Sequence, residues 1–272
     1  MCYLALGNLY YVTRGDEMLL VAGWREVSLV DVLDAPSFTV WLCGCNLRCP
    51  WCSNARIARG EGCKYVRVAD LADRAVEASK YVEYLHCTGG EPLLQARGLK
   101  ELFELGVEAG LLASLDTNGM LPRELEEIED LVHHVSVDVK APPSRPGLYA
   151  AVVGAPLEAG SELVGLLVRS IEIATQFEFC ELRTTMVPGL IGPREVEEIA
   201  SFLSEFLGLR RGERRVAYVV QQFIPYEGVE GRFRGEPRTP PDLVEEAARR
   251  AAKKLSIEVY ARTLEHGLRK YG

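Results

Sequence analysis

The sequence lacks the features that would place it in a membrane or outside the cell. No apolar run approaches the ~20 residues that a membrane-spanning helix requires. No cationic segment followed by an apolar stretch is visible near residue 1, so we expect no secretory signal. The eight cysteines are therefore expected in a reduced, cytoplasmic setting, where cysteines more often bind metal or react than form disulfides.

Features typical of nucleic-acid binding are also scarce. The formal net charge is −8, which argues against a protein that tracks nucleic-acid phosphates. The four histidines form no metal-ligand pattern, and no internal repeat or long low-complexity tract is evident. The histidines therefore indicate no metal site, and we expect no repeat architecture.

What is present is the composition and periodicity of an α/β protein. The 272 residues are 48% apolar and 26% charged, which suffices for a sizeable globular core. Apolar runs of strand length alternate with helical periodicity, which indicates βαβ units and a parallel sheet. The expected strands are 38–42, 82–87, 111–116, 134–139, 178–187, 215–223 and 257–262, and the expected helices are 68–79, 98–109, 122–132, 161–176, 193–206 and 241–254.

About six such units follow the first strand, which suits a partial (β/α)6 barrel. Residues 1–37 are expected to form an N-terminal β lead-in, with a hairpin made by 3–12 and 18–21. Residues 38–272 then form the barrel, and both parts belong to a single domain. The segment 228–241, rich in Gly and Pro and without a period, is the expected mobile loop.

A cysteine motif directly follows the first barrel strand, in the stretch 45–52, which reads CNLRCPWC. Thiolates are soft ligands, and a short loop that carries Cys45, Cys49 and Cys52 can hold three corners of a [4Fe–4S] cube. No fourth cysteine lies at a ferredoxin-like offset, so one iron would stay open to a ligand from outside the protein. The plainer alternative is a zinc knot or a chance cluster of cysteines.

The remaining cysteines form no local pair, so we expect no second cluster. Cys43 is expected in the core, because it points away from Cys45 if the strand continues. No role is assigned to Cys2, Cys63, Cys87 and Cys180.

The cysteine loop and the residues after it, CSN at 52–54, resemble the cluster loop of the radical S-adenosylmethionine (SAM) enzymes. The stretch 44–54 is most similar to the activases of glycyl radical enzymes, among them those of anaerobic ribonucleotide reductase and pyruvate formate-lyase. This resemblance implies one [4Fe–4S] cluster on Cys45, Cys49 and Cys52, with Trp51 and Ser53 at SAM. In that superfamily the reduced cluster cleaves SAM to methionine and a 5′-deoxyadenosyl radical, which takes a hydrogen atom from the substrate.

The stretch TGGEP at 88–92 ends the next strand. Two glycines let a backbone approach a ligand closely, and exposed carbonyls can accept hydrogen bonds from an ammonium group. Taken alone it is a common turn, for which a structural role is the favoured interpretation. The superfamily has a Gly-Gly-Glu-Pro motif at the SAM amino group, so the resemblance places Gly89, Gly90 and Glu91 there.

Two further strand ends carry acidic residues. The stretch DTNG at 116–119 is a turn sequence in its own right. The pyruvate formate-lyase activase has the same four residues, so the resemblance places Asp116 and Thr117 at a monovalent cation beside the SAM carboxylate. Asp138 and Lys140 lie two apart on one strand face, where the plain interpretation is a surface ion pair. The resemblance places both against SAM.

Arg183 and Gln222 complete the predicted site. An arginine that points into a barrel mouth is a natural bidentate partner for a carboxylate, so we expect Arg183 to contact SAM or the substrate. The stretch QQF at 221–223 is very similar to the reductase activators, and Gln222 is expected to contact SAM. The pyruvate formate-lyase activase has a histidine after its Pro-Tyr, where this chain has Glu227.

The resemblance covers most of the chain and implies a radical SAM oxidoreductase that takes hydrogen from a glycine of a glycyl radical enzyme, foremost the anaerobic ribonucleotide reductase. A flavodoxin- or ferredoxin-type protein would supply the electron. A second reading changes the substrate to a small molecule or a tRNA base, of deazapurine or wyosine type. A third is a zinc- or cluster-bearing binding protein without turnover, against which the polar strand ends at Asp116, Asp138 and Lys140 argue.

Overall fold

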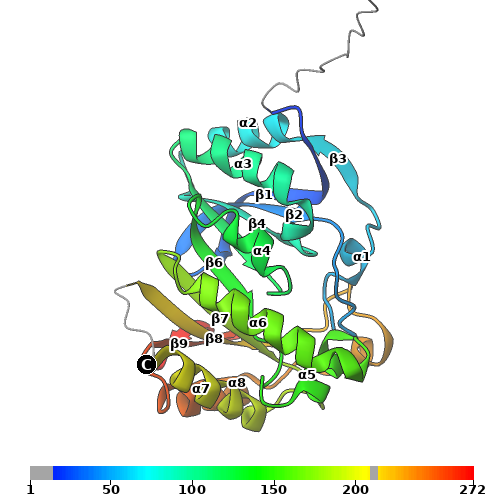
Figure 1. Cartoon of the computed structure of the whole chain (residues 1–272), viewed down its shortest axis with the longest axis vertical. Coiled ribbons are helices and arrows are strands. Elements are labelled where there is room, and N and C mark those ends of the chain that lie inside the picture. The colour runs from blue at the N-terminus through cyan, green and yellow to red at the C-terminus, as the bar shows by residue number, and fades with distance from the viewer. Residues whose placement is uncertain (1–14, 209–213) are drawn as a thin grey trace, which may run out of the picture.

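The computed structural model describes residues 15–208 and 214–272. In this part of the chain one sheet has the strand order β10-β9-β8-β7-β6-β5-β4-β2-β1-β3 (Figure 1). Its central strands run parallel and in chain order, so their C-terminal ends meet at one edge. These strands are β2 (Ala35–Leu42), β4 (Tyr84–Gly89), β5 (Leu112–Thr117), β6 (Val132–Asp138), β7 (Phe179–Met186), β8 (Arg215–Gln222) and β9 (Glu258–Thr263).

Antiparallel strands extend the sheet at both ends. β1 (Met18–Val32) pairs with β2 and, near its start, with β3 (Lys64–Arg67), while β10 (Gly267–Lys270) pairs with β9. The expected strand at 18–21 is thus the start of a longer strand, and its expected hairpin partner at 3–12 lies outside the described residues. The division of the chain at residue 37 stays a prediction, and β1 pairs with β2 across it.

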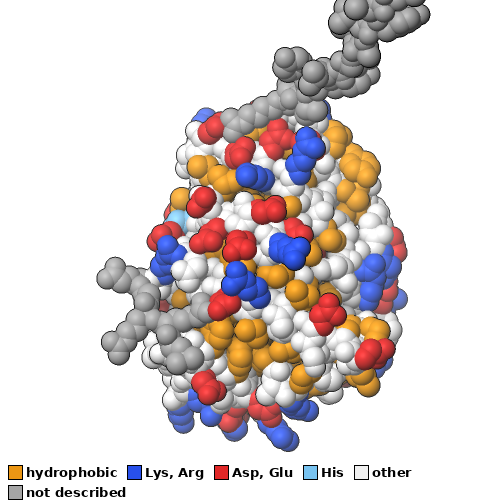
Figure 2. Space-filling model, in the orientation of Figure 1, with side chains coloured by type: hydrophobic (Ala, Val, Ile, Leu, Met, Phe, Trp, Pro, Cys, Tyr) orange, Lys and Arg blue, Asp and Glu red, His pale blue; other side chains and the backbone are white. Residues whose placement is uncertain are grey.

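Helices cover the outer, convex face of the sheet (Figure 1). On the face seen in Figure 2, acidic and basic side chains are interspersed with hydrophobic and other uncharged ones. None of the described helices has both the length and the apolar character needed to cross a bilayer. The longer helices are α2 (Val68–Ala78), α3 (Ala96–Glu108), α6 (Gly160–Ala174), α7 (Pro193–Gly208) and α8 (Pro241–Ala252); the short ones are α1 (Ala55–Ala58), α4 (Pro122–Glu126), α5 (Pro146–Val153), η1 (Pro92–Gln95), η2 (Leu157–Ala159) and η3 (Gly231–Gly235).

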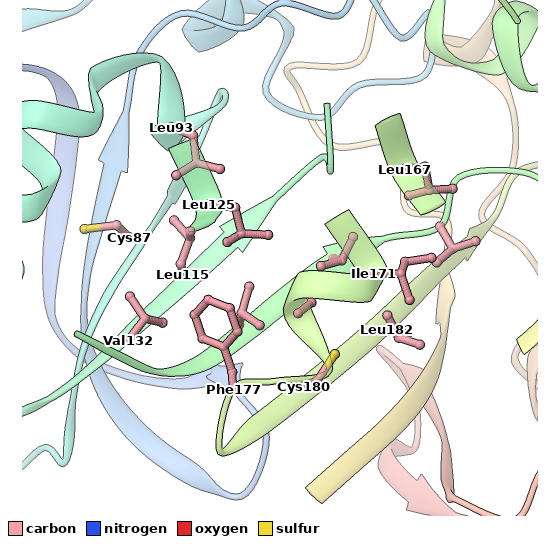
Figure 3. Close-up of a cluster of buried hydrophobic side chains, with 14 of the residues drawn as sticks. Cys87, Leu93, Leu115, Leu125, Val132, Leu167, Ile171, Phe177, Cys180 and Leu182 are labelled. Carbon is pink, nitrogen blue, oxygen red and sulfur yellow. The ribbon is translucent and has the colours of Figure 1, made fainter. Parts of the chain in front are cut away.

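The main core lies between the helices and the outward-facing side chains of the strands. Figure 3 shows part of it, where Leu115 and Leu182 from the sheet face Leu125 and Ile171 from the helices. Cys87 and Cys180 belong to the same cluster and are fully buried, and burial raises the pKa of both thiols. These two cysteines are therefore core side chains.

The opposite, concave face of the sheet is polar and is partly filled by the turn between β1 and β2. Leu33 from this turn packs with Phe179, Val219 and Tyr260 on the concave face. Arg183 Nη2 also donates to the Asp31 carbonyl across 2.7 Å. Because residues from the far strands of the sheet meet in this way, the sheet is curled, and the predicted α/β partial barrel is confirmed.

Two of the helices that differ from prediction, α4 and α5, have a clear physical reason. The helix expected at 122–132 is only α4 (Pro122–Glu126), because the chain turns over 127–131 and then enters β6. α5 (Pro146–Val153) was not predicted. Its sequence, PGLYAAVV, contains no charged residue, so it shows no amphipathic period from which a helix could be recognised.

Candidate active site

The three motif cysteines lie in a loop that follows β2, at the C-terminal edge of the sheet. Within this loop the Leu47 amide donates to Cys45 Sγ across 3.4 Å, and the Cys52 amide donates to the Cys49 carbonyl across 3.1 Å. All three thiols are free of disulfides. Burial raises the pKa of each of them, that of Cys49 to about 12. A metal group bound here must therefore displace protons.

The donor set fits an iron–sulfur cluster. All three thiols line two cavities of about 220 and 270 Å³ that share these residues. Within residues 15–208 and 214–272, no three His, Cys, Asp or Glu side chains converge closely enough to hold a single metal ion. A four-iron cube does not need that convergence, because each thiolate binds a different iron. Cys45, Cys49 and Cys52 would hold such a cube and leave one iron for an outside ligand.

A disulfide lies beside this loop. Cys43, at the end of β2, is bonded to Cys63, just before β3, with their Cα atoms 6.5 Å apart. Cys43 is buried, as expected for a core residue. The pairing itself differs from the expectation of reduced cysteines, and no local pattern indicates it because the two residues are twenty positions apart. The bond ties the start of the cysteine loop to the segment before β3.

The cavity of about 220 Å³ is built by strand ends on the concave face. The predicted site residues that line it are Cys45, Cys49, Trp51, Cys52, Ser53, Gly89, Gly90, Asp116, Thr117, Asp138, Lys140 and Arg183. The residues that line it without having been predicted are Leu47, Asn54, Ala58, Thr88, Asn118, Thr185 and Gln221. The fold thus brings the ends of β4, β5, β6, β7 and β8 to the cysteine loop.

Glu91 is fully buried and is not among the residues that line this cavity. Its carboxylate accepts hydrogen bonds from Thr117 Oγ1 (2.9 Å) and from the amides of Asn118 (2.7 Å) and Leu93 (3.2 Å). Burial outweighs these bonds and raises the pKa of Glu91 to about 7. Glu91 therefore joins the ends of β4 and β5, and the Thr117 hydroxyl is occupied in the same contact.

Gly90 brings β4 against the cysteine loop. The amide of the next residue, Glu91, donates to the Gly44 carbonyl across 2.8 Å. A Cβ built on Gly90 would overlap that carbonyl, so only glycine fits this close approach. Asn54 Nδ2 donates to the Gly89 carbonyl across 3.1 Å. The two glycines predicted at SAM are thus also packing positions for the loop.

Asp116 and Arg183 form a buried charge network on the concave face. Arg183 Nη1 lies 2.8 Å from Asp116 Oδ1, and Arg183 Nε lies 2.6 Å from Glu181 Oε1. Burial alone would raise the pKa of Asp116, but the adjacent guanidinium holds it well below its usual range. Asp116, predicted at a monovalent cation, therefore already faces a protein cation.

Lys140 lies between an acid, an aromatic ring and the thiols. Its Nζ lies 2.6 Å from Asp138 Oδ2 and 5.3 Å from the centre of the Trp51 ring. Burial alone would lower the pKa of Lys140, but the adjacent Asp138 carboxylate raises it above its usual value. Asp138 and Lys140 are thus paired at the cavity wall, and Lys140 is almost completely buried.

The two neighbouring glutamines have different surroundings. Gln222 Nε2 donates to the Thr239 carbonyl across 2.7 Å, and its Oε1 accepts from the Leu264 amide across 2.8 Å. Gln221 instead lines the cavity, where it pairs in register with Thr185 of β7. The period of two along a strand was the signal that could have identified it. Glu227, where the activase has a histidine, is exposed and is not among the residues that line the cavity.

A family model of the radical SAM superfamily matches residues 39–203 of this chain. Over most of its length the chain is also similar to a protein of Methanocaldococcus jannaschii whose assignment as a glycyl-radical enzyme activating enzyme is provisional. The two are 27% identical over 250 residues, which span 90% of this chain and 96% of that protein.

A shorter stretch is similar to the 7-carboxy-7-deazaguanine synthase of Hyperthermus butylicus, with 41% identity over 115 residues, 41% of this chain and 47% of that enzyme. Among solved structures, TYW1 with a lysine-pyruvate adduct bound has the same fold. It matches with a TM-score of 0.59 and 12% identity, over 86% of this chain and 80% of that one. This chain belongs to the radical SAM superfamily, whose enzymes use a [4Fe–4S] cluster and SAM.

Proposed function

We propose that this enzyme activates a glycyl radical enzyme, foremost the anaerobic ribonucleotide reductase, by taking a hydrogen atom from a glycine Cα. The observation that carries the proposal is the similarity to an activating enzyme over 90% of the chain. A likeness of that extent includes the parts of the barrel that face the substrate as well as those that face SAM. Similarity to the deazaguanine synthase is higher in identity but stops at 41% of the chain.

The proposed SAM site is the cavity beside the thiols. The cluster, when bound by Cys45, Cys49 and Cys52, supplies the electron that cleaves SAM. Arg183 has four of its five N–H donors occupied by Glu181, Asp116 and the Asp31 carbonyl. Its remaining donor is assigned to the SAM carboxylate, since guanidinium groups bind carboxylates well.

The other cavity residues are assigned to the rest of SAM. The strand end at Gly89 and Gly90 is assigned to the amino group, and Lys140 to the polar groups of the ribose. The Trp51 ring and the Lys140 stem exclude water from the reacting atoms, which protects a reactive carbon radical from side reactions.

A second groove supports a peptide substrate. It has a volume of about 340 Å³ and shares Trp51, Thr185 and Gln221 with the SAM cavity. Its outer rim includes Val30 and Leu264, each more than half exposed. An open apolar groove suits the side chains of an extended peptide, whose backbone would deliver the glycine toward SAM.

We also propose the route for the electron. The cavity of about 270 Å³ reaches all three thiols and is lined by Arg48, Arg59 and Arg232, and by Glu230, which pairs with Arg59. Arginines around an opening favour association with an acidic partner. A flavodoxin- or ferredoxin-type carrier with an acidic surface is therefore proposed to dock there.

A second candidate function is radical chemistry on a small molecule of deazapurine type. The 41% identity to the deazaguanine synthase, over the stretch that they share, favours it. A tRNA substrate is less favoured, because a net charge of −8 opposes phosphate binding.

Anaerobic incubation of the reconstituted protein with SAM, a reductant and the candidate reductase distinguishes these functions. We expect 5′-deoxyadenosine together with a glycyl doublet in the electron paramagnetic resonance spectrum. A reductase whose radical glycine is replaced by alanine should give no doublet. Brisk 5′-deoxyadenosine formation without a doublet from the intact reductase would reject the activase and favour the second candidate.

A further inference from the structure

The segment 226–235, which follows β8, lies directly on the cysteine loop. In Figure 1 the orange chain after β8 and the blue chain that precedes α1 meet beside α5. The closest approach is at Gly228, where an added Cβ would overlap the Ser53 carbonyl. The obstacle is backbone, which cannot rotate away as a flexible side chain can. Position 228 therefore accepts only glycine while the cysteine loop keeps this conformation.

Buried apolar side chains anchor this segment on one side of the loop. Val229 and Phe233 are 0% and 1% exposed and pack with Val187 and Phe223, with Trp51 of the cysteine loop at the edge of the cluster. Burial of such side chains stabilises the packed position of the segment. The segment that the sequence predicted to be a mobile loop is thus packed into the protein at these residues.

An ion pair anchors the segment on its outer side. Glu230 accepts two hydrogen bonds from Arg59, at 2.6 and 2.9 Å, and Arg59 directly follows α1 of the cysteine region. The pair is exposed, so it contributes less than the apolar contacts. It nevertheless fixes the distance between the segment and the loop, because both carboxylate oxygens of Glu230 accept a hydrogen bond from Arg59.

Other elements hold the opposite side of the loop. The Arg48 amide donates to the Val153 carbonyl across 3.1 Å, and Trp51 Nε1 donates to the Val152 carbonyl across 2.9 Å. The loop is therefore held between the C-terminal end of α5 and the segment 226–235. The α5 carbonyls hold Arg48 and Trp51, and the segment 226–235 contacts Ser53. All three residues are direct neighbours of Cys49 or Cys52.

We propose that residues 226–235 are a clamp that positions the cysteine loop for cluster binding, with Gly228 as its point of contact. The clamp has no place in the SAM cavity, so its role differs from that of the SAM contacts. Glu230 and Phe233 form, with the three thiols, the wall of the cavity of about 270 Å³. The clamp therefore sets the spacing of the thiols and restricts access to them. This inference does not depend on which substrate the enzyme uses.

Gly228→Ala tests the clamp, with Gly235→Ala as the matched control from the same segment. A Cβ on Gly235 meets nothing within 4 Å. Partners that orient metal ligands typically change metal affinity 10–100-fold when altered, so Gly228→Ala should lose iron to a chelator about 10-fold faster under anaerobic conditions. Its reduced cluster should also give an altered electron paramagnetic resonance signal without SAM, while circular dichroism stays unchanged. Gly235→Ala should match the wild type.

Equal iron content, chelation rate and spectrum in Gly228→Ala and Gly235→Ala would overturn the proposal. If Gly228→Ala does not fold, Glu230→Ala decides, because it removes an exposed anchor without straining the backbone. An exposed pair contributes little, so iron loss should be only about two- to fivefold faster. An unchanged rate in Glu230→Ala would then reject the clamp.

Discussion

The guanidinium of Arg183 lies 2.8 Å from the carboxylate of Asp116, between the ends of β7 and β5. Both side chains stand on the concave face, and Arg183 is only 6% exposed. The carboxylate that the resemblance places at a monovalent cation is therefore paired with a protein guanidinium, which it shares with Glu181.

Replacing Arg183 by methionine is expected to destabilise the protein by about 3–5 kcal/mol, because it removes the guanidinium that lies closest to the buried carboxylates of Asp116 and Glu181. Chemical denaturation measures this loss. The double variant Arg183→Met, Asp116→Asn should be less unstable than the sum of the two single variants, since the uncompensated charge of Asp116 is gone. Additive effects would show that the two groups do not interact energetically.

Each of the substitutions Cys45→Ser, Cys49→Ser and Cys52→Ser is expected to abolish stable cluster binding, because a hydroxyl is a poor ligand for a cluster of this kind. Iron and sulfide content after anaerobic reconstitution measures the effect. Cys180→Ser is the control, since Cys180 is a core residue. It should cost stability but keep the iron content of the wild type, and a loss of iron in that variant would give Cys180 a role in the cluster.

Alanine substitution is expected to affect stability at Gln222 and activity at Gln221. Gln222→Ala breaks bonds to the Thr239 carbonyl and the Leu264 amide, so it should lower the free energy of unfolding by about 1–3 kcal/mol. Gln221→Ala should leave stability nearly unchanged and slow the formation of 5′-deoxyadenosine. Denaturation and product analysis of the two variants make the comparison, and the reverse pattern would contradict the assignment of Gln221 to the cavity.

Glu91 is expected to give stability a specific pH dependence. Its pKa is raised to about 7 in the folded protein, above the ordinary value of about 4.3. The folded protein therefore favours the protonated carboxyl of Glu91. The stabilisation of the fold that this provides is fully present below about pH 4 and is lost as the pH rises through 7. Between about pH 4 and pH 8 the wild type should lose about 3 kcal/mol more of its free energy of unfolding than Glu91→Gln. Parallel pH curves for the two proteins would show that Glu91 ionises normally.

The strands were predictable because a buried strand bears its apolar residues in short, dense runs. Two helix predictions were wrong because helices are recognised by a different pattern, the amphipathic period. α5 has no charged residue and so no amphipathic signal, while 122–132 continues a helical pattern that the chain interrupts to enter β6. Gln221, which lines the cavity, was not predicted because sequence similarity marks a stretch, whereas strand alternation decides which side chain faces the cavity.

The sequence by itself determined the order of strands and helices, the three thiols and the polar residues at strand ends, because spacing and periodicity are local properties of the chain. Only the tertiary structure decided which of these groups meet. The Arg183 pairing with Asp116, the Cys43–Cys63 disulfide and the contact of Gly228 with Ser53 each join segments far apart in the chain. Such contacts depend on how the sheet curls and how loops cross its edge, and no local pattern encodes those distances.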